Sequence, residues 1–116
     1  MNVEELELAA GKIREDFEKQ NINYNLLKEL YLRDNSIGDI DSFIEESKKV
    51  FPKLNCGLAS VYLKEKLKVG EVVKGKYKEA NHTFLLIDEE IIVDITADQF
   101  GGQKVYVGPV IYPWSF

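Results

Sequence analysis

The chain has one cysteine and one histidine among its 116 residues, and the surroundings of both suit chemistry. Cys56 begins the segment 56–67, which has helical character, and Asn55 before it is a good N-cap residue. The positive end of a helix macrodipole lowers the pKa of a thiol placed there. His82 lies in an apolar segment of strand character, and an imidazole beside the thiol can accept its proton. The two residues therefore predict nucleophilic attack by sulfur on a carbonyl carbon.

A base of this kind needs a group that orients it, and Asp94 is the first candidate. The segments 82–87 and 91–96 are predicted as strands joined by an acidic turn, so they form an antiparallel hairpin. Side chains alternate across a strand, and His82 and Asp94 are in phase on the two strands. We expect the carboxylate to hold the imidazole in one orientation. Asp98 is a rival that ranks below Asp94, because it lies where the second strand ends.

Two registers of this hairpin are compatible with the pattern. Pairing Ile87 with Ile91 places His82 opposite Thr96 and diagonal to Asp94. A register shifted by two residues places His82 directly opposite Asp94. Both registers leave the imidazole and the carboxylate on the same side of the sheet, within reach of a hydrogen bond.

An oxyanion formed in such a reaction needs donors. The free N–H groups of the first helical turn, including that of Cys56, are expected to provide one donor. A second donor must come from a side chain, for which Asn55 and Gln99 are the candidates. Gln99 lies in the segment 97–102, which we expect to be a loop that can border the cleft.

The elements that must position these residues change in character along the chain. An apolar stripe at spacings of three and four predicts a helix over residues 3–17, and a short helix is expected around 26–31. Ser42 and Glu45 fit a capping box that opens a third helix, which Pro52 stops. From residue 69 onward the pattern is that of strands, which we place at 71–77, 82–87, 91–96, 104–107 and 110–112.

Helices followed by an antiparallel meander predict an α+β fold. We expect one domain over residues 1–116, with a helical part at 1–51 and the cysteine helix and sheet at 55–116. Because the sheet is apolar on both faces, we expect the cysteine helix to cover one face and the N-terminal helices to cover the other.

Composition excludes several classes of function. The net charge is −5 and the lysines are scattered among glutamates, which argues against nucleic acid as a partner. A single cysteine cannot form an internal disulfide and suits a reducing compartment. No membrane span or basic-then-apolar leader is apparent, so we expect a cytoplasmic protein without a membrane partner, although export without a cleaved signal would leave the same pattern. One cysteine and one histidine argue against a metal site, and no glycine-rich phosphate loop indicates a cofactor.

Three segments together resemble the papain-like and transglutaminase-like cysteine hydrolase superfamily. They are the helix start Asn55-Cys56-Gly57-Leu58-Ala59-Ser60, the strand Asn81-His82-Thr83-Phe84-Leu85-Leu86-Ile87 and its neighbour Ile92-Val93-Asp94-Ile95-Thr96. The order Cys, His, Asp and the short interval between His and Asp are closest to the transglutaminase-like branch, and small bacterial deamidase and effector domains share that order. The resemblance implies Cys56 as nucleophile, His82 as general base and acid, and Asp94 as the orienting residue.

The same resemblance implies amide chemistry through a thioester, as in a peptidase, a glutamine deamidase or a transglutaminase, with a protein or peptide as substrate. Two departures leave the reaction open: no glutamine precedes Cys56 to serve the oxyanion, and no tryptophan stands beside it. An alternative is a binding module that keeps the fold without the chemistry. A third possibility is the catalytic segment of a larger toxin or effector.

Overall fold

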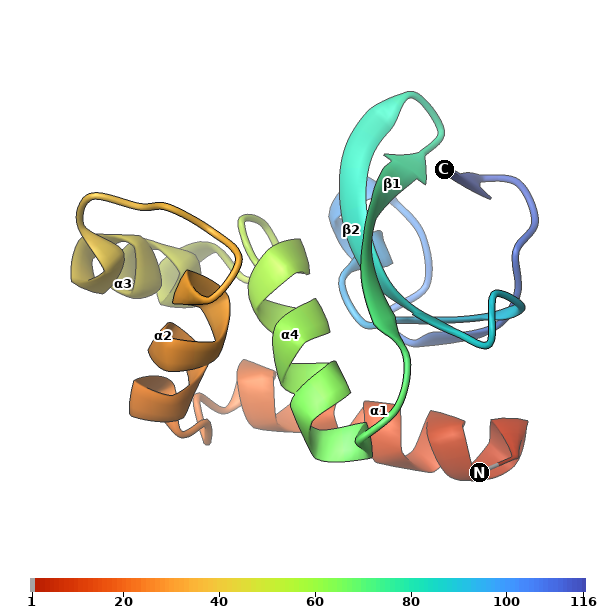
Figure 1. Ribbon diagram of the computed structural model, residues 1–116, viewed down its shortest axis with the longest axis horizontal. Coiled ribbons are helices and arrows are strands. Elements are labelled where there is room, and N and C mark those ends of the chain that lie inside the picture. Colours follow the sequence, from red (N-terminus) through yellow and green to blue (C-terminus); the bar gives the residue numbers. More distant parts are fainter. Residues whose placement is uncertain (1) are drawn as a thin grey trace.

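The computed structural model describes residues 2–116 as four helices followed by a curled five-stranded antiparallel sheet, which is the predicted α+β class (Figure 1). The helices are α1 (Val3–Glu18), α2 (Tyr24–Leu32), α3 (Ile40–Val50) and α4 (Cys56–Leu67). The strands are β1 (Glu71–Tyr77), β2 (Ala80–Ile87), β3 (Ile91–Asp94), β4 (Tyr106–Pro109) and β5 (Trp114–Ser115), with the short 3-10 helix η1 (Ala97–Phe100) between β3 and β4.

The helices begin where short polar side chains satisfy free backbone N–H groups, but not always at the predicted residue. Asn2 and Glu5 form a capping box at the start of α1. The predicted box at Ser42 is wrong, because Asp39 is the N-cap of α3 and its carboxylate accepts the hydrogen bond from the Ser42 amide. Helix α3 ends before Pro52, as expected from the conformation that a proline imposes on the residue before it.

The sheet has the strand order β4-β3-β2-β1-β5, so β2 lies at its centre. Strands β2 and β3 pair Ile87 with Ile91 and Leu85 with Val93, which is the first of the two predicted registers. Strand β1 pairs with β2 along its whole length, whereas β5 pairs only with Lys76 and Tyr77 of β1.

The end of the chain differs from the prediction. The strand expected at 104–107 lies at Tyr106–Pro109, and the strand expected at 110–112 is replaced by Trp114–Ser115. Gly108 and Pro109 were expected to separate two strands but belong to β4. This strand lies at the edge of the sheet, where a proline, which has no backbone N–H, is tolerated. The segment expected to be a loop contains the helix η1.

The coverage of the sheet also differs from the prediction. All four helices contribute to one core with Leu85, Ile87, Val93 and Ile95, so the cysteine helix and the N-terminal helices pack on the same face. The other face carries a second core that the C-terminal segment closes, with Tyr77, Phe84, Leu86, Ile92, Ala97 and Trp114 as its buried members. Figure 1 shows this division, with the helices on one side of β1 and β2 and the blue C-terminal segments on the other. Within residues 2–116, no helix is both long enough and apolar enough to span a membrane.

The register of β1 against β2 predicts the effect of one substitution. Gly75 pairs with His82, and a Cβ atom at Gly75 would lie 2.5 Å from the Ser115 carbonyl oxygen and 2.9 Å from the Phe84 ring. We expect Gly75→Ala to lower the free energy of unfolding by roughly 1–3 kcal/mol, since these atoms must move apart. Urea unfolding measures the loss. Gly11→Ala is the control: nothing lies within 4 Å of the added Cβ in α1, and the helix should gain roughly 0.5–1 kcal/mol. Equal stability of the Gly75→Ala variant and the wild type would contradict the packing described.

Candidate active site

His82 and Asp94 form a buried pair on the face of the sheet away from the helices. The Nε2 atom of His82 lies 2.6 Å from Oδ2 of Asp94, and both residues are 2% exposed. The prediction that the two side chains lie on one side of the sheet within hydrogen-bond reach is therefore confirmed.

The Asp94 carboxylate accepts further hydrogen bonds that stabilise it away from water. The Thr96 amide donates to Oδ1 over 2.9 Å, and the Trp114 indole Nε1 donates to Oδ2 over 2.8 Å. A buried carboxylate is costly without such donors, because its charge loses the hydration that water provides. Asp94 is thus held in place from the segment that follows β3 and from β5.

The partners of Asp94 decide which nitrogen of His82 can act as a base. A carboxylate only accepts hydrogen bonds. Nε2 therefore carries a proton and donates a hydrogen bond to Asp94. In the neutral ring Nδ1 then carries no proton. Nδ1 is buried and has no hydrogen-bond partner among the described residues. The ring therefore has a fixed tautomer with its basic nitrogen free.

Aromatic rings surround this imidazole. The Phe100 ring meets it edge-on with centroids 5.1 Å apart, and Tyr77 meets it edge-on at 6.1 Å. Phe84 lies 6.1 Å away in a tilted arrangement. These contacts exclude water and fix the plane of the ring, which strengthens the hydrogen bond to Asp94.

Cys56 is half-buried at the first position of α4, as predicted. Burial by itself raises the pKa of this thiol, but the interaction with the His82 imidazole and hydrogen bonding to the backbone and hydroxyl of Thr83 outweigh it. The net effect is a thiol pKa below its usual value. His82 and Thr83, which are adjacent residues of β2, thus both lower the pKa of the Cys56 thiol.

The imidazole responds in the opposite direction. Burial lowers the pKa of His82, but the hydrogen bond to Asp94 and the interaction with Cys56 raise it to about 9. A lowered pKa on sulfur and a raised pKa on nitrogen both favour transfer of the proton from Cys56 to His82. The arrangement favours a thiolate beside an imidazolium at neutral pH.

Asn55 has a different role from the one expected. It precedes α4, but its side chain makes no capping hydrogen bond to that helix. Its Nδ2 instead donates to the carbonyl oxygens of Ser47 and Lys53, over 2.9 and 2.7 Å. Both N–H bonds of the amide are used, so the Asn55 side chain has no donor left for an oxyanion.

Gln99 and Asp98 lie next to each other in η1 and differ in their bonding. Asp98 makes a bidentate ion pair with Arg14 of α1, with N–O distances of 2.7 and 2.9 Å, so it does not orient His82. The Nε2 atom of Gln99 is buried and has no partner among the described residues. Gln99 thus keeps a donor free where one would serve an oxyanion.

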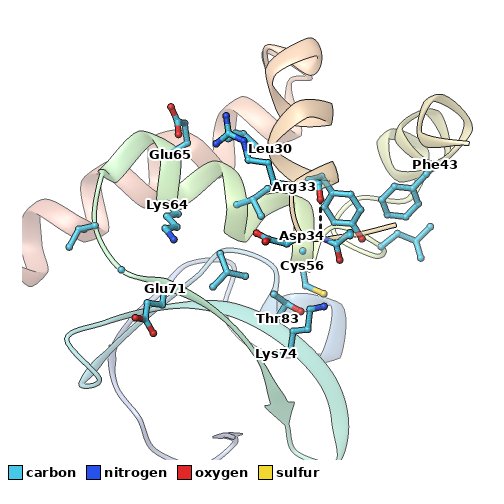
Figure 2. A pocket seen from close by; sticks show the side chains of 18 of the residues that line it. Leu30, Arg33, Asp34, Phe43, Cys56, Lys64, Glu65, Glu71, Lys74 and Thr83 are labelled. Carbon is cyan, nitrogen blue, oxygen red and sulfur yellow. Dashed lines mark hydrogen bonds between the residues drawn. The ribbon is translucent and has the colours of Figure 1, made fainter. Parts of the chain in front are cut away.

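A groove of about 1200 Å³ passes Cys56 (Figure 2): on one side of the cysteine it runs between α4 and β1, and on the other it continues toward Phe43 of α3. Gln99 and Thr83 line it together with Cys56. In Figure 2 the Cys56 sulfur points from the start of α4 toward Thr83 and Lys74, with Glu71 and Lys64 on one side of it and Phe43 on the other. A ligand in the groove can therefore reach the sulfur and the first turn of α4, with the Gln99 side chain in the lining.

Sequence reasoning missed several residues of this site. Nothing in the sequence links Trp114 to Asp94, which precedes it by 20 positions. Arg14 was also not identified from the sequence. Its position on the apolar stripe of α1 indicates a buried charge, which needs an acidic partner. Among residues 2–116, no three His, Cys, Asp or Glu side chains gather as a metal would require.

No protein-family model, no curated protein and no solved structure matches the chain. The site is therefore interpreted from its own geometry.

The paired pKa shifts predict how Cys56 is alkylated by iodoacetamide. The thiolate reacts, so the lowered pKa places the first titration midpoint below the pKa of an ordinary free thiol. A second rise is expected near pH 9, where His82 loses its proton and the thiolate its charged neighbour. His82→Ala should move the first midpoint upward, because burial then raises the thiol pKa unopposed by imidazole. Circular dichroism of the variant verifies that it is folded; an unchanged midpoint in a folded variant would contradict the pairing.

Proposed function

We propose that this protein is a thiol-dependent amide hydrolase or acyl transferase with Cys56 as nucleophile, His82 as general base and acid, and Asp94 as the orienting residue. The observation that carries the proposal is the state of the His82 ring: Nε2 is bound to Asp94 at 2.6 Å, while Nδ1 is buried, unpartnered and close enough to Cys56 for the two groups to shift each other's pKa. A structural histidine would have both nitrogens satisfied.

The reaction follows from the position of the protons. The thiol proton moves to Nδ1 of His82, and the Cys56 sulfur bonds to the carbonyl carbon of an amide. The carbonyl π electrons move to oxygen and form an oxyanion. When they return, the C–N bond breaks, and the departing nitrogen takes the proton from Nδ1 as ammonia or an amine. Water or an amine then attacks the thioester, gives its proton to Nδ1, and releases the sulfur as the thiolate, which restores the pair of thiolate and imidazolium.

The oxyanion needs two donors, and the chain offers both at the mouth of the groove. Backbone N–H groups of the first turn of α4, including that of Cys56, have no intrahelical acceptor. The unpartnered Nε2 of Gln99 supports this residue as the second donor. We therefore propose Gln99 and omit Asn55, whose side chain already donates twice.

A kinship with the papain-like and transglutaminase-like superfamily is part of the proposal. What supports it is a helix that begins at cysteine, packed against a sheet whose neighbouring antiparallel strands carry histidine and aspartate. The open groove supports a protein or peptide substrate rather than an enclosed small molecule.

The decisive experiment compares the products that wild-type and Cys56→Ala proteins generate from a proteome, by mass spectrometry. Conversion of glutamine to glutamate indicates deamidation, new chain ends indicate proteolysis, and crosslinks indicate amine transfer. We expect one of these products with the wild type and none with Cys56→Ala. Lys12→Ala, at an exposed position in α1, is the control that should retain the product. Absence of any Cys56-dependent product would overturn the enzymatic proposal in favour of a binding module.

The role of Gln99 has its own test once a substrate is known. Gln99→Ala should lower kcat by roughly 10²–10³-fold with little change in KM, because the lost donor acts mainly on the oxyanion. Gln103→Ala is the matched control: this exposed glutamine follows shortly after η1 and does not line the groove. A Gln99→Ala enzyme as active as the control would remove Gln99 from the mechanism.

A further inference from the structure

The outer edge of β1 is open along the part of the groove that leads to Cys56. Among residues 2–116, β5 pairs only with Lys76 and Tyr77, so no strand pairs with the outer edge over Glu71–Lys74. Val69, Gly70, Glu71 and Val72 line the groove in succession. Because side chains alternate across a strand, lining by Glu71 and Val72 together indicates that the strand's edge borders the groove as well as one of its faces.

The opposite wall comes from one side of α4. Gly57, Val61, Lys64 and Lys68 recur at spacings of three and four, and they line the groove from the Cys56 end to the end of the helix. This part of the groove therefore lies between α4 and β1 and leads to the sulfur, beyond which the lining continues to Tyr31 and Phe43. In Figure 2, Glu71 and Lys74 mark the β1 side of this path and Lys64 and Glu65 mark the α4 side.

From this geometry we propose that the groove binds an extended polypeptide segment, which adds a strand to β1 at Glu71–Lys74 and presents its amide to Cys56. This inference names the substrate class of the proposed function and rests on that function for its catalytic part. Unpaired backbone N–H and C=O groups at a sheet edge are satisfied by another extended backbone. Four residues of edge correspond to about 13 Å of strand.

Size and charge favour a segment of another protein over the alternatives. The groove volume of about 1200 Å³ is above the usual range for pockets that enclose a small ligand, roughly 300–1,000 Å³. In a second copy of this chain, the β1 edge lies beside its own α4. That helix would have to pass the α4 that forms the opposite wall of the groove before the two edges could pair. Glu71 and Lys74 are exposed and charged, which discourages pairing between identical edges.

The test uses Cys56→Ala protein and a random peptide library displayed on phage. We expect enriched peptides whose binding slows hydrogen exchange of the Glu71–Lys74 amides. N-methylation of synthetic copies should weaken binding about tenfold at every second residue, because alternate amides face the sheet edge. Binding that is insensitive to methylation, or that leaves these amides unprotected, would overturn the inference. Protection of the same amides by raised protein concentration alone would assign the edge to a second copy and would also overturn it.

Two matched substitutions on α4 separate this inference from the proposed function. Lys64→Trp fills the groove, whereas Lys66→Trp places the same side chain at an exposed position outside it. For each, peptide binding is measured in the Cys56→Ala background and alkylation in the background that retains Cys56. Lys64→Trp should abolish peptide binding and leave the iodoacetamide pH profile of Cys56 unchanged, and Lys66→Trp should leave both unchanged.

Peptide binding that survives Lys64→Trp refutes the groove assignment while the thiol chemistry stands. An ordinary thiol titration with intact, groove-dependent peptide binding refutes the catalytic proposal and leaves a peptide-binding module.

Discussion

The hydrogen bond between His82 and Asp94 is the interaction on which the site depends, because it places a carboxylate where water cannot reach it. Such a charge persists only when several donors converge on it. The Thr96 amide and the Trp114 indole supply them, so strand β3 and the end of the chain must both be in position before the imidazole has a fixed tautomer. The C-terminal segment thus closes a core and completes the support of a base.

The two faces of the sheet carry different parts of the site. The helical face holds α4 through an aliphatic core, and α4 carries Cys56 at its start. The other face encloses His82 in aromatic rings. At the beginning of β2, His82 is followed by Thr83, and both residues lower the pKa of Cys56. The ion pair of Arg14 and Asp98 joins the faces, since it ties α1 to η1, whose other residues include Gln99 and Phe100.

Much of this arrangement could be predicted from residue order, because it depends on short-range patterns. The alternation of side chains along 82–87 and 91–96 predicted that His82 and Asp94 lie on the same side of the sheet. Two registers of the hairpin were compatible with the pattern, and the structure has the one that pairs Ile87 with Ile91. The capping of α3 and the role of Asn55 were predicted wrongly, because several polar residues near a helix start can serve the same backbone groups. The coverage of the sheet was also wrong, since an apolar face does not specify which element will cover it.

Local sequence determined the α+β class, the position of Cys56 at a helix start, and the phase of His82 with Asp94, since each follows from periodicity within one hairpin or helix. Tertiary structure alone decided that Trp114 stabilises Asp94, that Asp98 pairs with Arg14, and that Gln99 keeps a free donor beside the groove. These contacts join residues from 20 to 84 positions apart, or depend on the partners available to a buried amide. Packing of the whole chain selects such partners, because a buried polar group takes whichever donor or acceptor the fold brings to it.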